Sequence, residues 1–227
     1  FAEEHLPLRS EYSASDEGRI NKGAAKILFG KVYLTKGDFQ KAKDKLAEVV
    51  EHESEYGFGL HKDYHANWLR DTEAGIEAVL YIEYKEPPFQ HNGEMALAGP
   101  KYSIPGSLGI SALNEADIPT QELYDQFDNR DLRKKTNFKT EFAHLKTGEI
   151  LKSSIPLSGK FWVEGLETGD RCDVNMHIIR YADAILMYAE ALNEVGKSTK
   201  ALAMLNRIRE RAFGDDSGNF KPMSKDE

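Results

Sequence analysis

The sequence predicts a mainly α-helical protein, in which two helical hairpins flank a long irregular insert that contains a few short strands. Amphipathic periodicity near both ends predicts the hairpins, a glycine interrupts each of these regions, and the middle is rich in proline, glycine and aromatic residues. The 227 residues exceed the ~100–150 of a typical domain, yet they still fit one domain. We therefore expect a single domain with four parts: a first hairpin at 17–52, the insert at 53–177, a second hairpin at 178–213 and a flexible tail at 214–227.

The first hairpin is predicted from two stretches of amphipathic periodicity. Apolar residues recur at three- and four-residue steps over 17–35 and again over 39–52, as they do along one face of an α-helix. Asp16 can cap the first helix, and Gly37 can end it in the left-handed conformation. Asp38 then suits the N-cap of the second helix. Because the turn between the two helices is so short, they should lie antiparallel.

The second hairpin repeats the pattern of the first. A helix is expected over 178–195, Gly196 breaks it, and a further helix follows over 200–211. When Gly37 is aligned with Gly196, the similar residues of the two hairpins share one offset of 159 positions. The other aligned pairs are Gly30 with Ala189, Tyr33 with Leu192, Ala42 with Ala201, Leu46 with Leu205, and Val49 with Ile208. Small residues suit the point where two helices cross closely. The pattern resembles the tetratricopeptide repeat, whose period of ~34 residues is far shorter than the offset, so the insert must separate the hairpins.

The insert has a different texture from the hairpins. Its clearest strand is predicted at 78–84, which is rich in β-branched and aromatic residues. Prolines and glycines make 87–118 a long irregular loop, and such loops within compact domains are usually functional or disordered. Thr120 can cap a short helix that runs to Asn129. Residues 130–177 are charged, and we expect only short extended pieces there.

Charge and apolar runs exclude several classes of protein. The chain has 30 basic and 38 acidic residues, and its net charge of −8 repels phosphate backbones, so we expect no nucleic acid partner. The same charge mildly disfavours polyanionic ligands. The longest apolar run, Ala184–Ala189, has six residues, whereas a membrane-spanning helix needs ~20. A single cysteine, Cys172, leaves no intrachain disulfide.

The sequence contains no recognisable catalytic motif. It lacks a nucleophile elbow, a phosphate-binding glycine loop and an HExxH helix. His61, Asp63 and His65 are the best candidates for metal ligands, because two histidines four residues apart can share a helix face. A further ligand at the right spacing is missing, and we predict no metal site.

Loop-borne aromatic residues offer a route to binding instead. Flat aromatic faces with polar edges suit the C–H faces of sugar rings, and neighbouring polar side chains can fix the hydroxyl groups. The alternative is that these aromatic residues pack beneath the long loop. The predicted ligand-binding residues are Phe89, His91, Asn92, Lys101, Tyr102, Asn114 and Trp162. Tyr64 and Trp68 lie four apart in an expected helix, and we predict that they belong to the core.

Three blocks of the sequence resemble the SusD/RagB family of proteins, in the same order and at similar intervals. The last block is the most specific. The blocks are Leu6-Pro7 with Gly18-Arg19-Ile20 and Gly37-Asp38-Phe39, then Pro119–Tyr124 with Asp131-Leu132-Arg133, and finally Ile179–Glu194 with Leu205–Ala212. The resemblance covers nearly the whole chain. It implies a scaffold of tetratricopeptide-like helical pairs that carries variable ligand-binding loops.

The resemblance also implies a function and a location. SusD-like proteins are lipid-anchored on the extracellular face of the Gram-negative outer membrane, where they bind nutrient, usually glycan, without catalysis. They act as a lid on a SusC-like TonB-dependent transporter. From the resemblance we therefore predict a cell-surface protein that captures an oligo- or polysaccharide for import, and that is not an enzyme and needs no cofactor. A helical-repeat scaffold that binds peptide or protein is the alternative.

The chain also departs from the family pattern. The lipid-bearing cysteine of the family follows an N-terminal signal, whereas Cys172 lies in the middle of this chain. The first helical pairs and the closing helices of the family have no counterpart here. We therefore expect an internal to C-terminal fragment, whose only membrane contact would be a lipid anchor that this fragment does not contain. No binding residue can be transferred by motif, because the ligand loops vary between members.

Overall fold

The computed structural model describes residues 1–85 and 92–222 and is mainly helical, as predicted. The chain divides into two compact units. The helical unit consists of Phe1–Asp63, Ala74–Ile82 and His177–Glu227, and the loop unit consists of Tyr64–Glu73 and Glu83–Met176. Among the described residues, every helix is too short or too polar to cross a membrane.

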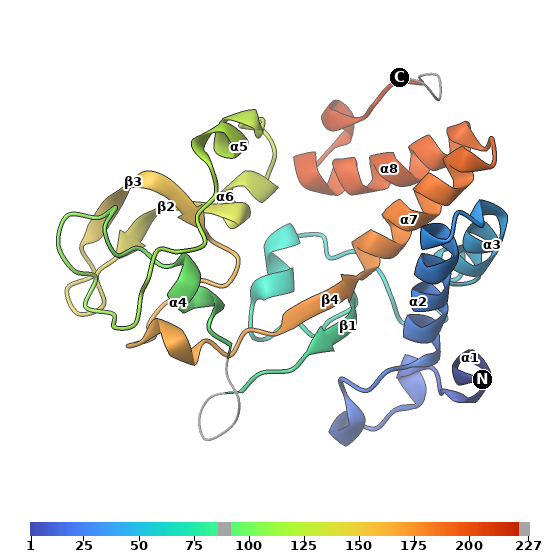
Figure 1. Ribbon diagram of the computed structural model, residues 1–227, viewed down its shortest axis with the longest axis horizontal. Coiled ribbons are helices and arrows are strands. Elements are labelled where there is room, and N and C mark those ends of the chain that lie inside the picture. Colours follow the sequence, from blue (N-terminus) through green and yellow to red (C-terminus); the bar gives the residue numbers. More distant parts are fainter. Residues whose placement is uncertain (86–91, 223–227) are drawn as a thin grey trace. The chain divides into compact units, whose positions relative to one another are not determined.

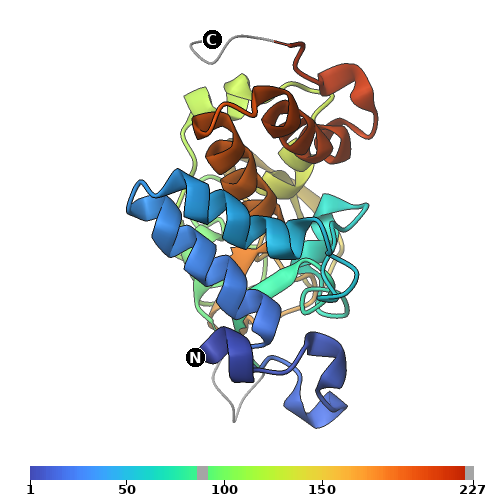
Figure 2. The ribbon, with the colours of Figure 1, turned by 90° about the vertical axis from the view of Figure 1, so that its right-hand side faces the viewer.

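The first helical hairpin consists of α2 (Lys22–Thr35) and α3 (Phe39–Val50), which lie side by side in Figure 2. The turn follows the prediction, because Gly37 has a φ of +74° and the Asp38 side chain accepts a hydrogen bond from the backbone N–H of Lys41. A Cβ atom on Gly30 would lie 2.5 Å from Cγ of the fully buried Leu46. This close approach confirms the role predicted for a small residue at the helix crossing.

The predicted start of the first helix, at residue 17, is wrong. The helix begins at Lys22, because the side chain of Asn21 accepts a hydrogen bond of 3.0 Å from the backbone N–H of Ala24 and so caps the N-terminus. Asp16, the predicted cap, instead ends a short 3₁₀ turn, Ala14–Asp16, in the segment that links α1 (Ala2–His5) to α2.

The second hairpin consists of α7 (Tyr181–Glu194) and α8 (Ser198–Phe213), with Gly196 at a φ of +75° between them. Figure 1 shows that β4 (Met176–Arg180) runs directly into α7. The predicted helix over 178–195 is therefore wrong at its first three residues. Ile178 and Ile179 are β-branched and favour a strand, and β1 (Ala78–Ile82) is available as a pairing partner.

The two hairpins share one hydrophobic core, in which α7 packs against both α3 and α8. Most of the side chains of α7 are buried, which explains its nearly continuous apolar sequence. The largest buried side chains of this core come from α2, α3 and α7: Ile27, Leu46, Val49, Tyr181, Ile185, Tyr188 and Leu192. The Tyr181 hydroxyl donates a hydrogen bond of 2.7 Å to Glu53, which also pairs with Arg207 of α8.

The loop unit contains an antiparallel pair of strands within 130–177, where short extended pieces were expected but no pairing was predicted. Strands β2 (Phe138–Ala143) and β3 (Ile150–Ser158) pair with Phe138 opposite Ser158, and their register shifts between Lys139 and Glu141. Short helices surround the pair: α4 (Glu94–Ala98), α5 (Gln121–Gln126) and α6 (Arg133–Asn137). Thr120 caps α5 as predicted, although the helix ends before Asn129.

Residues 214–222 form part of the helical unit, where a flexible tail was expected. The chain turns back after α8, and the backbone N–H of Phe220 donates a hydrogen bond of 2.9 Å to the side chain of Asn206. The guanidinium carbon of Arg209 lies 3.9 Å from the centre of the Phe220 ring. A cation stacked on an aromatic ring and a side-chain acceptor thus hold this segment on α8.

A buried carboxylate joins three segments of the helical unit. Glu77, just before β1, is fully buried, and its two carboxylate oxygens pair with Arg180 at 2.6 Å and Arg211 at 2.8 Å. The backbone N–H of His61 donates to the same carboxylate, and the carbonyl of Glu77 accepts from the N–H of Tyr181 at 2.8 Å. Because the Arg211 side chain is only 6% exposed, this charge needs its counter-charge in place.

We expect Glu77→Gln to lower the free energy of unfolding by about 3–5 kcal/mol, because it leaves a largely buried guanidinium facing a neutral amide. The matched control is Asp183→Asn, which removes a half-exposed partner of Lys31 at 3.7 Å and should cost less than about 1 kcal/mol. Urea denaturation at pH 7 measures both effects. Equal losses in the two variants would contradict the assignment of Glu77 as a structural centre.

Candidate functional site

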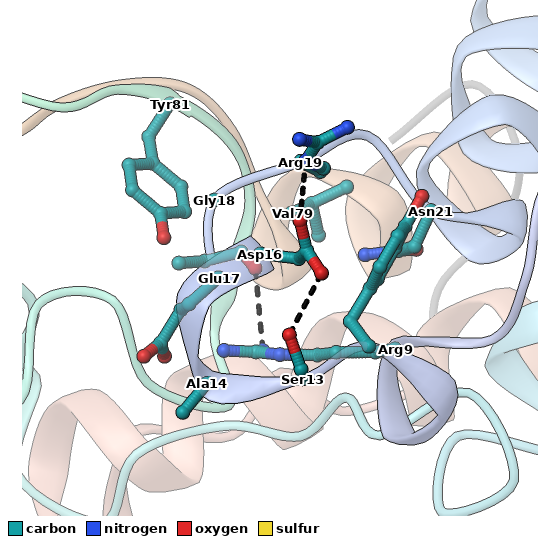
Figure 3. Close-up of a pocket in the computed structure, with 12 residues that line it drawn as sticks. Arg9, Ser13, Ala14, Asp16, Glu17, Gly18, Arg19, Asn21, Val79 and Tyr81 are labelled. Atoms are coloured by element: carbon teal, nitrogen blue, oxygen red, sulfur yellow. Dashed lines mark hydrogen bonds and ion pairs between the residues drawn. The ribbon is translucent and has the colours of Figure 1, made fainter.

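The helical unit contains a small pocket of about 150 Å³ near the N-terminal segment (Figure 3). Its polar side chains serve the fold. The guanidinium of Arg9 donates to the carbonyl oxygens of Ala74 and Gly75, and Asp16 accepts from the Ser13 hydroxyl at 2.7 Å. Asn21, on the pocket wall, caps α2. These hydrogen bonds hold the N-terminal segment against the residues before β1. The pocket is therefore a poor candidate for a ligand site.

A larger groove, of about 590 Å³, lies within the loop unit. The short 3₁₀ helix Tyr64–Trp68 and the residues after it form one part of its lining, and α6, β2 and the segment after β3 supply the rest. Its aromatic and charged lining residues are His65, Trp68, Arg70, Asp71, Lys135, Lys139, Trp162 and Glu164. Residues from distant parts of the sequence thus meet at one concave surface.

Two tryptophan rings give the groove its apolar lining. Trp68 is 7% exposed and packs edge-on against Tyr64 at 4.6 Å between ring centres, which confirms its predicted place in the core. Trp162 is partly buried and packs edge-on against Phe142 at 4.7 Å. The indole N–H of Trp162 is buried without an acceptor among the described residues, so it is a donor for which this part of the chain supplies no partner.

The charged residues of the groove fall into pairs and single charges. Arg70 pairs with Asp173 at 2.6 Å, and Lys139 pairs with Glu164 at 2.9 Å. Two exposed lining residues remain, Asp71 and Lys135, and within 1–85 and 92–222 neither makes an ion pair or hydrogen bond through its side chain. An unpaired carboxylate and an unpaired ammonium are therefore available to accept and donate hydrogen bonds at this surface.

A second exposed surface lies on the loop that follows α4. Tyr102 is 75% exposed, and the ammonium of Lys101 lies 5.2 Å from the centre of its ring. Asn114 is also exposed, and its backbone N–H donates to the carbonyl of Ala96. Glu115 connects these residues, because its carboxylate accepts hydrogen bonds from the turn that carries Tyr102. The structure thus brings Lys101, Tyr102 and Asn114 onto one loop, and the described residues of this loop do not line the tryptophan groove.

The structure places the predicted ligand-binding residues in different surroundings. Trp162 lines the groove, and Lys101, Tyr102 and Asn114 lie on the exposed loop. Asn92 is 3% exposed, and its side chain bonds the backbone of Val174 and Glu94, so it holds the loop together instead of facing a ligand. The other two predicted residues, Phe89 and His91, lie outside the described residues.

Sequence reasoning missed the charged residues of the groove. Asp71, Lys135 and Lys139 lie among many other charged residues, and no motif or spacing distinguishes them. Only the tertiary structure shows which charges are paired.

Within the described part of the chain, no group of three or more His, Cys, Asp or Glu side chains could hold a metal ion.

A buried carboxylate supports the chain segment beside the groove. Glu73 follows the lining residues 70–72, is 5% exposed, and accepts a hydrogen bond of 2.8 Å from the backbone N–H of Asn175. Burial raises the pKa of Glu73 to about 7, and the nearby Asp173 adds to this rise, whereas the bond from Asn175 opposes it. Glu73 is therefore protonated in the folded state at mildly acidic pH.

We expect the loop unit to lose stability as the pH rises from about 4.5 to about 7. In this range the unfolded chain releases the Glu73 proton while the folded chain keeps it, so the ionisation costs up to ~3 kcal/mol by pH 8. Glu73→Gln should remove this dependence, whereas Glu167→Gln, at an exposed site, should retain it. Thermal unfolding at pH 5 and pH 8 tests this. An identical pH dependence of wild type and Glu73→Gln would exclude a raised pKa.

Comparisons with known proteins agree with the predicted family. Residues 152–226 match the model of the SusD family. SusD-like protein P2 of Formosa agariphila is 29% identical over 230 residues, which cover 90% of this chain and 44% of that protein. A SusD-like protein of Bacteroides ovatus is 23% identical over 87% of this chain and 41% of its own length. The chain thus spans less than half the length of these relatives.

Solved structures share the fold of this chain. A SusD superfamily protein of Parabacteroides distasonis superposes with a TM-score of 0.74 at 24% identity, covering 92% of this chain and 47% of that one. Surface glycan-binding protein A of Bacteroides thetaiotaomicron, solved with laminarihexaose, gives a TM-score of 0.75 at 18% identity, covering 96% and 52%. The sequence is thus similar to SusD-like proteins, as its residue blocks predicted, and the chain shares its fold with the superposed structures.

Proposed function

We propose that this chain is part of a non-catalytic cell-surface protein that binds glycan through the tryptophan groove of the loop unit. One observation carries the proposal: Trp68 and Trp162 line the same groove as two charged side chains, Asp71 and Lys135, that have no partner within the described residues. Tyr102, on its exposed loop, is proposed as a further contact.

The chemistry of the groove suits a sugar. Aromatic faces stack against the C–H faces of sugar rings for ~0.5–1.5 kcal/mol each beyond the burial of area, so affinity is modest and collective. Sugar hydroxyl groups both donate and accept, and the unpaired Asp71 and Lys135 supply the matching acceptor and donor.

The surroundings of the acids that line the groove favour binding over hydrolysis. Glycoside hydrolysis requires one carboxyl group that stays protonated near neutral pH, which burial in apolar surroundings normally achieves. Glu164 is instead solvent-exposed and paired with Lys139, and Asp71 is also exposed. Neither of the two acids that line the groove therefore has the apolar burial that a catalytic acid of this kind uses.

The names of structural neighbours support glycan as the ligand class. One neighbour is a surface glycan-binding protein solved with laminarihexaose, and another is described as a laminarin-binding SusD-like protein, with a TM-score of 0.70 at 24% identity. These ligands belong to the neighbours and are not known ligands of this chain. They are the reason to choose a β-glucan oligosaccharide as the first probe for this chain.

We expect Trp162→Ala to weaken binding of laminarihexaose, or of the best ligand in a panel with alginate and xylan oligosaccharides, by about two- to tenfold. Lys135→Ala should weaken binding while leaving the melting temperature unchanged, because the side chain is exposed and unpaired. Isothermal titration calorimetry measures both dissociation constants.

The matched control is Phe161→Ala. Phe161 precedes Trp162 and packs against the cluster of Tyr64, Trp68 and Met95, but does not line the groove. It should lower the melting temperature with little effect on affinity. Wild-type affinity in Trp162→Ala would rule out the groove as the site. Retention of peptides in place of every glycan would favour the alternative, a peptide-binding scaffold.

The wider cellular role is part of the same proposal. We propose that the full-length protein sits on the extracellular face of the outer membrane, held by a lipid anchor, and passes glycan to a SusC-like TonB-dependent transporter. The SusD/RagB-like sequence supports this role. Affinity purification of the full-length protein from detergent-solubilised outer membranes should recover such a transporter. Recovery from the periplasmic fraction, without a transporter, would contradict it.

A further inference from the structure

One carboxylate oxygen holds the turn that carries Tyr102. Oε2 of Glu115 accepts hydrogen bonds from three successive backbone N–H groups, those of Lys101 at 2.6 Å, Tyr102 at 2.7 Å and Ser103 at 2.9 Å. The hydroxyl of Ser103 donates to the same oxygen at 3.0 Å. Successive N–H groups that converge in this way form a small anion-binding concavity, which Glu115 fills from within the chain.

The backbone at Glu115 is held in a conformation that costs energy. Its φ is +52°, in the left-handed region that non-glycine residues seldom adopt, and Ala112 nearby has a φ of +55°. Such positions cost about 1–3 kcal/mol each and persist only where the surroundings fix them. Here the surroundings are the backbone around α4: the N–H of Glu115 donates to the carbonyl of Gly99, and the N–H of Ala116 to that of Leu97.

The clamped turn presents an aromatic ring to solvent. Tyr102 is 75% exposed although its backbone is tied down by Glu115, and its hydroxyl has no partner among residues 1–85 and 92–222. A ring on a fixed backbone loses less conformational freedom when a ligand stacks on it, which increases affinity. Burial raises the pKa of Glu115, but the hydrogen bonds from residues 101–103 outweigh this effect and lower the pKa below its usual value. The Glu115 carboxylate that holds the turn is therefore charged at neutral pH.

We propose that Glu115 is a positioning residue, which holds the 101–103 turn so that Tyr102 forms a second sugar-stacking surface in addition to the tryptophan groove. The inference rests on the proposed glycan-binding function. Glu115 acts on the ligand only through Tyr102.

A double-mutant cycle tests this dependence. Tyr102→Ala and Glu115→Gln should each weaken binding of the panel's best ligand, starting with laminarihexaose, by about two- to tenfold. The double variant should bind no more weakly than Tyr102→Ala alone, because Glu115 has nothing left to position. The matched control is Asp117→Asn, an exposed acid of the same loop that makes no side-chain hydrogen bond within the described residues, and its affinity should equal that of wild type.

Local hydrogen exchange separates positioning from a general loss of stability. In Glu115→Gln the amides of 101–103 should exchange at least tenfold faster, while those of α7 should not change. Ser103→Ala, which removes one of the four hydrogen bonds, should act in the same direction with a smaller effect, so the cycle can be completed if Glu115→Gln does not fold.

The outcomes distinguish this inference from the proposed function. If wild type binds no glycan of the panel, both are overturned. If wild type binds through Trp162 while the Tyr102, Glu115 and Ser103 variants keep wild-type affinity, only the positioning role is overturned. Additive losses in the double variant would also overturn it, since they would show that Glu115 acts independently of Tyr102.

Discussion

The helical unit depends on the buried carboxylate of Glu77. Its oxygens pair with Arg180 at the end of β4 and Arg211 in α8, and its own residue leads into β1. An ionised carboxylate in the interior is tolerated only while both guanidinium partners stay in place. Glu77 therefore fixes the segments at which the chain leaves the helical unit, after Ile82, and re-enters it, at His177. The strands at these two points, β1 and β4, pair with each other within the helical unit.

The loop unit uses carboxylates for a related purpose. Irregular segments have few partners for their backbone N–H groups, and a buried N–H without an acceptor is costly. Glu115 satisfies three of them in the turn at 101–103, and Glu73 satisfies that of Asn175. Side-chain acceptors thus replace the hydrogen bonds that a helix or sheet would supply. The residues that hold these loops in shape are acids whose carboxylates accept backbone hydrogen bonds, whereas three of the proposed binding residues, Asp71, Tyr102 and Lys135, are exposed.

The helices were largely predictable from the sequence, because their apolar periodicity and glycine turns are local signals. The error at the start of the first helix has a local cause, because Asn21 caps α2 in place of Asp16. The error at Ile178 and Ile179 has a tertiary cause, because these residues pair as a strand with the distant β1. The pairing of β2 with β3 was not predicted for the same reason. For the candidate site, the presence of aromatic side chains in loops is what favoured Tyr102 and Trp162, and their role in binding stays a prediction. Asn92 was proposed from its polar side chain and its loop setting, and only its burial shows that it is structural.

The charge of the whole chain is a weak guide to the charge of its ligand. The net charge of −8 acts over distance, and physiological salt screens such fields within ~8 Å. At the groove, contacts decide instead, and there the cations Arg70, Lys135 and Lys139 stand beside the acids Asp71 and Glu164. Among the described residues, Arg70 and Lys139 are each already paired, which leaves one ammonium and one carboxylate in the groove. On the proposed function, this balance matches the mixed donors and acceptors of a neutral sugar, whereas the described part of the chain offers an acidic sugar only Lys135 as an uncompensated partner. On that proposal, discrimination between neutral and acidic glycans depends on a few unpaired side chains, which neither composition nor motif can identify.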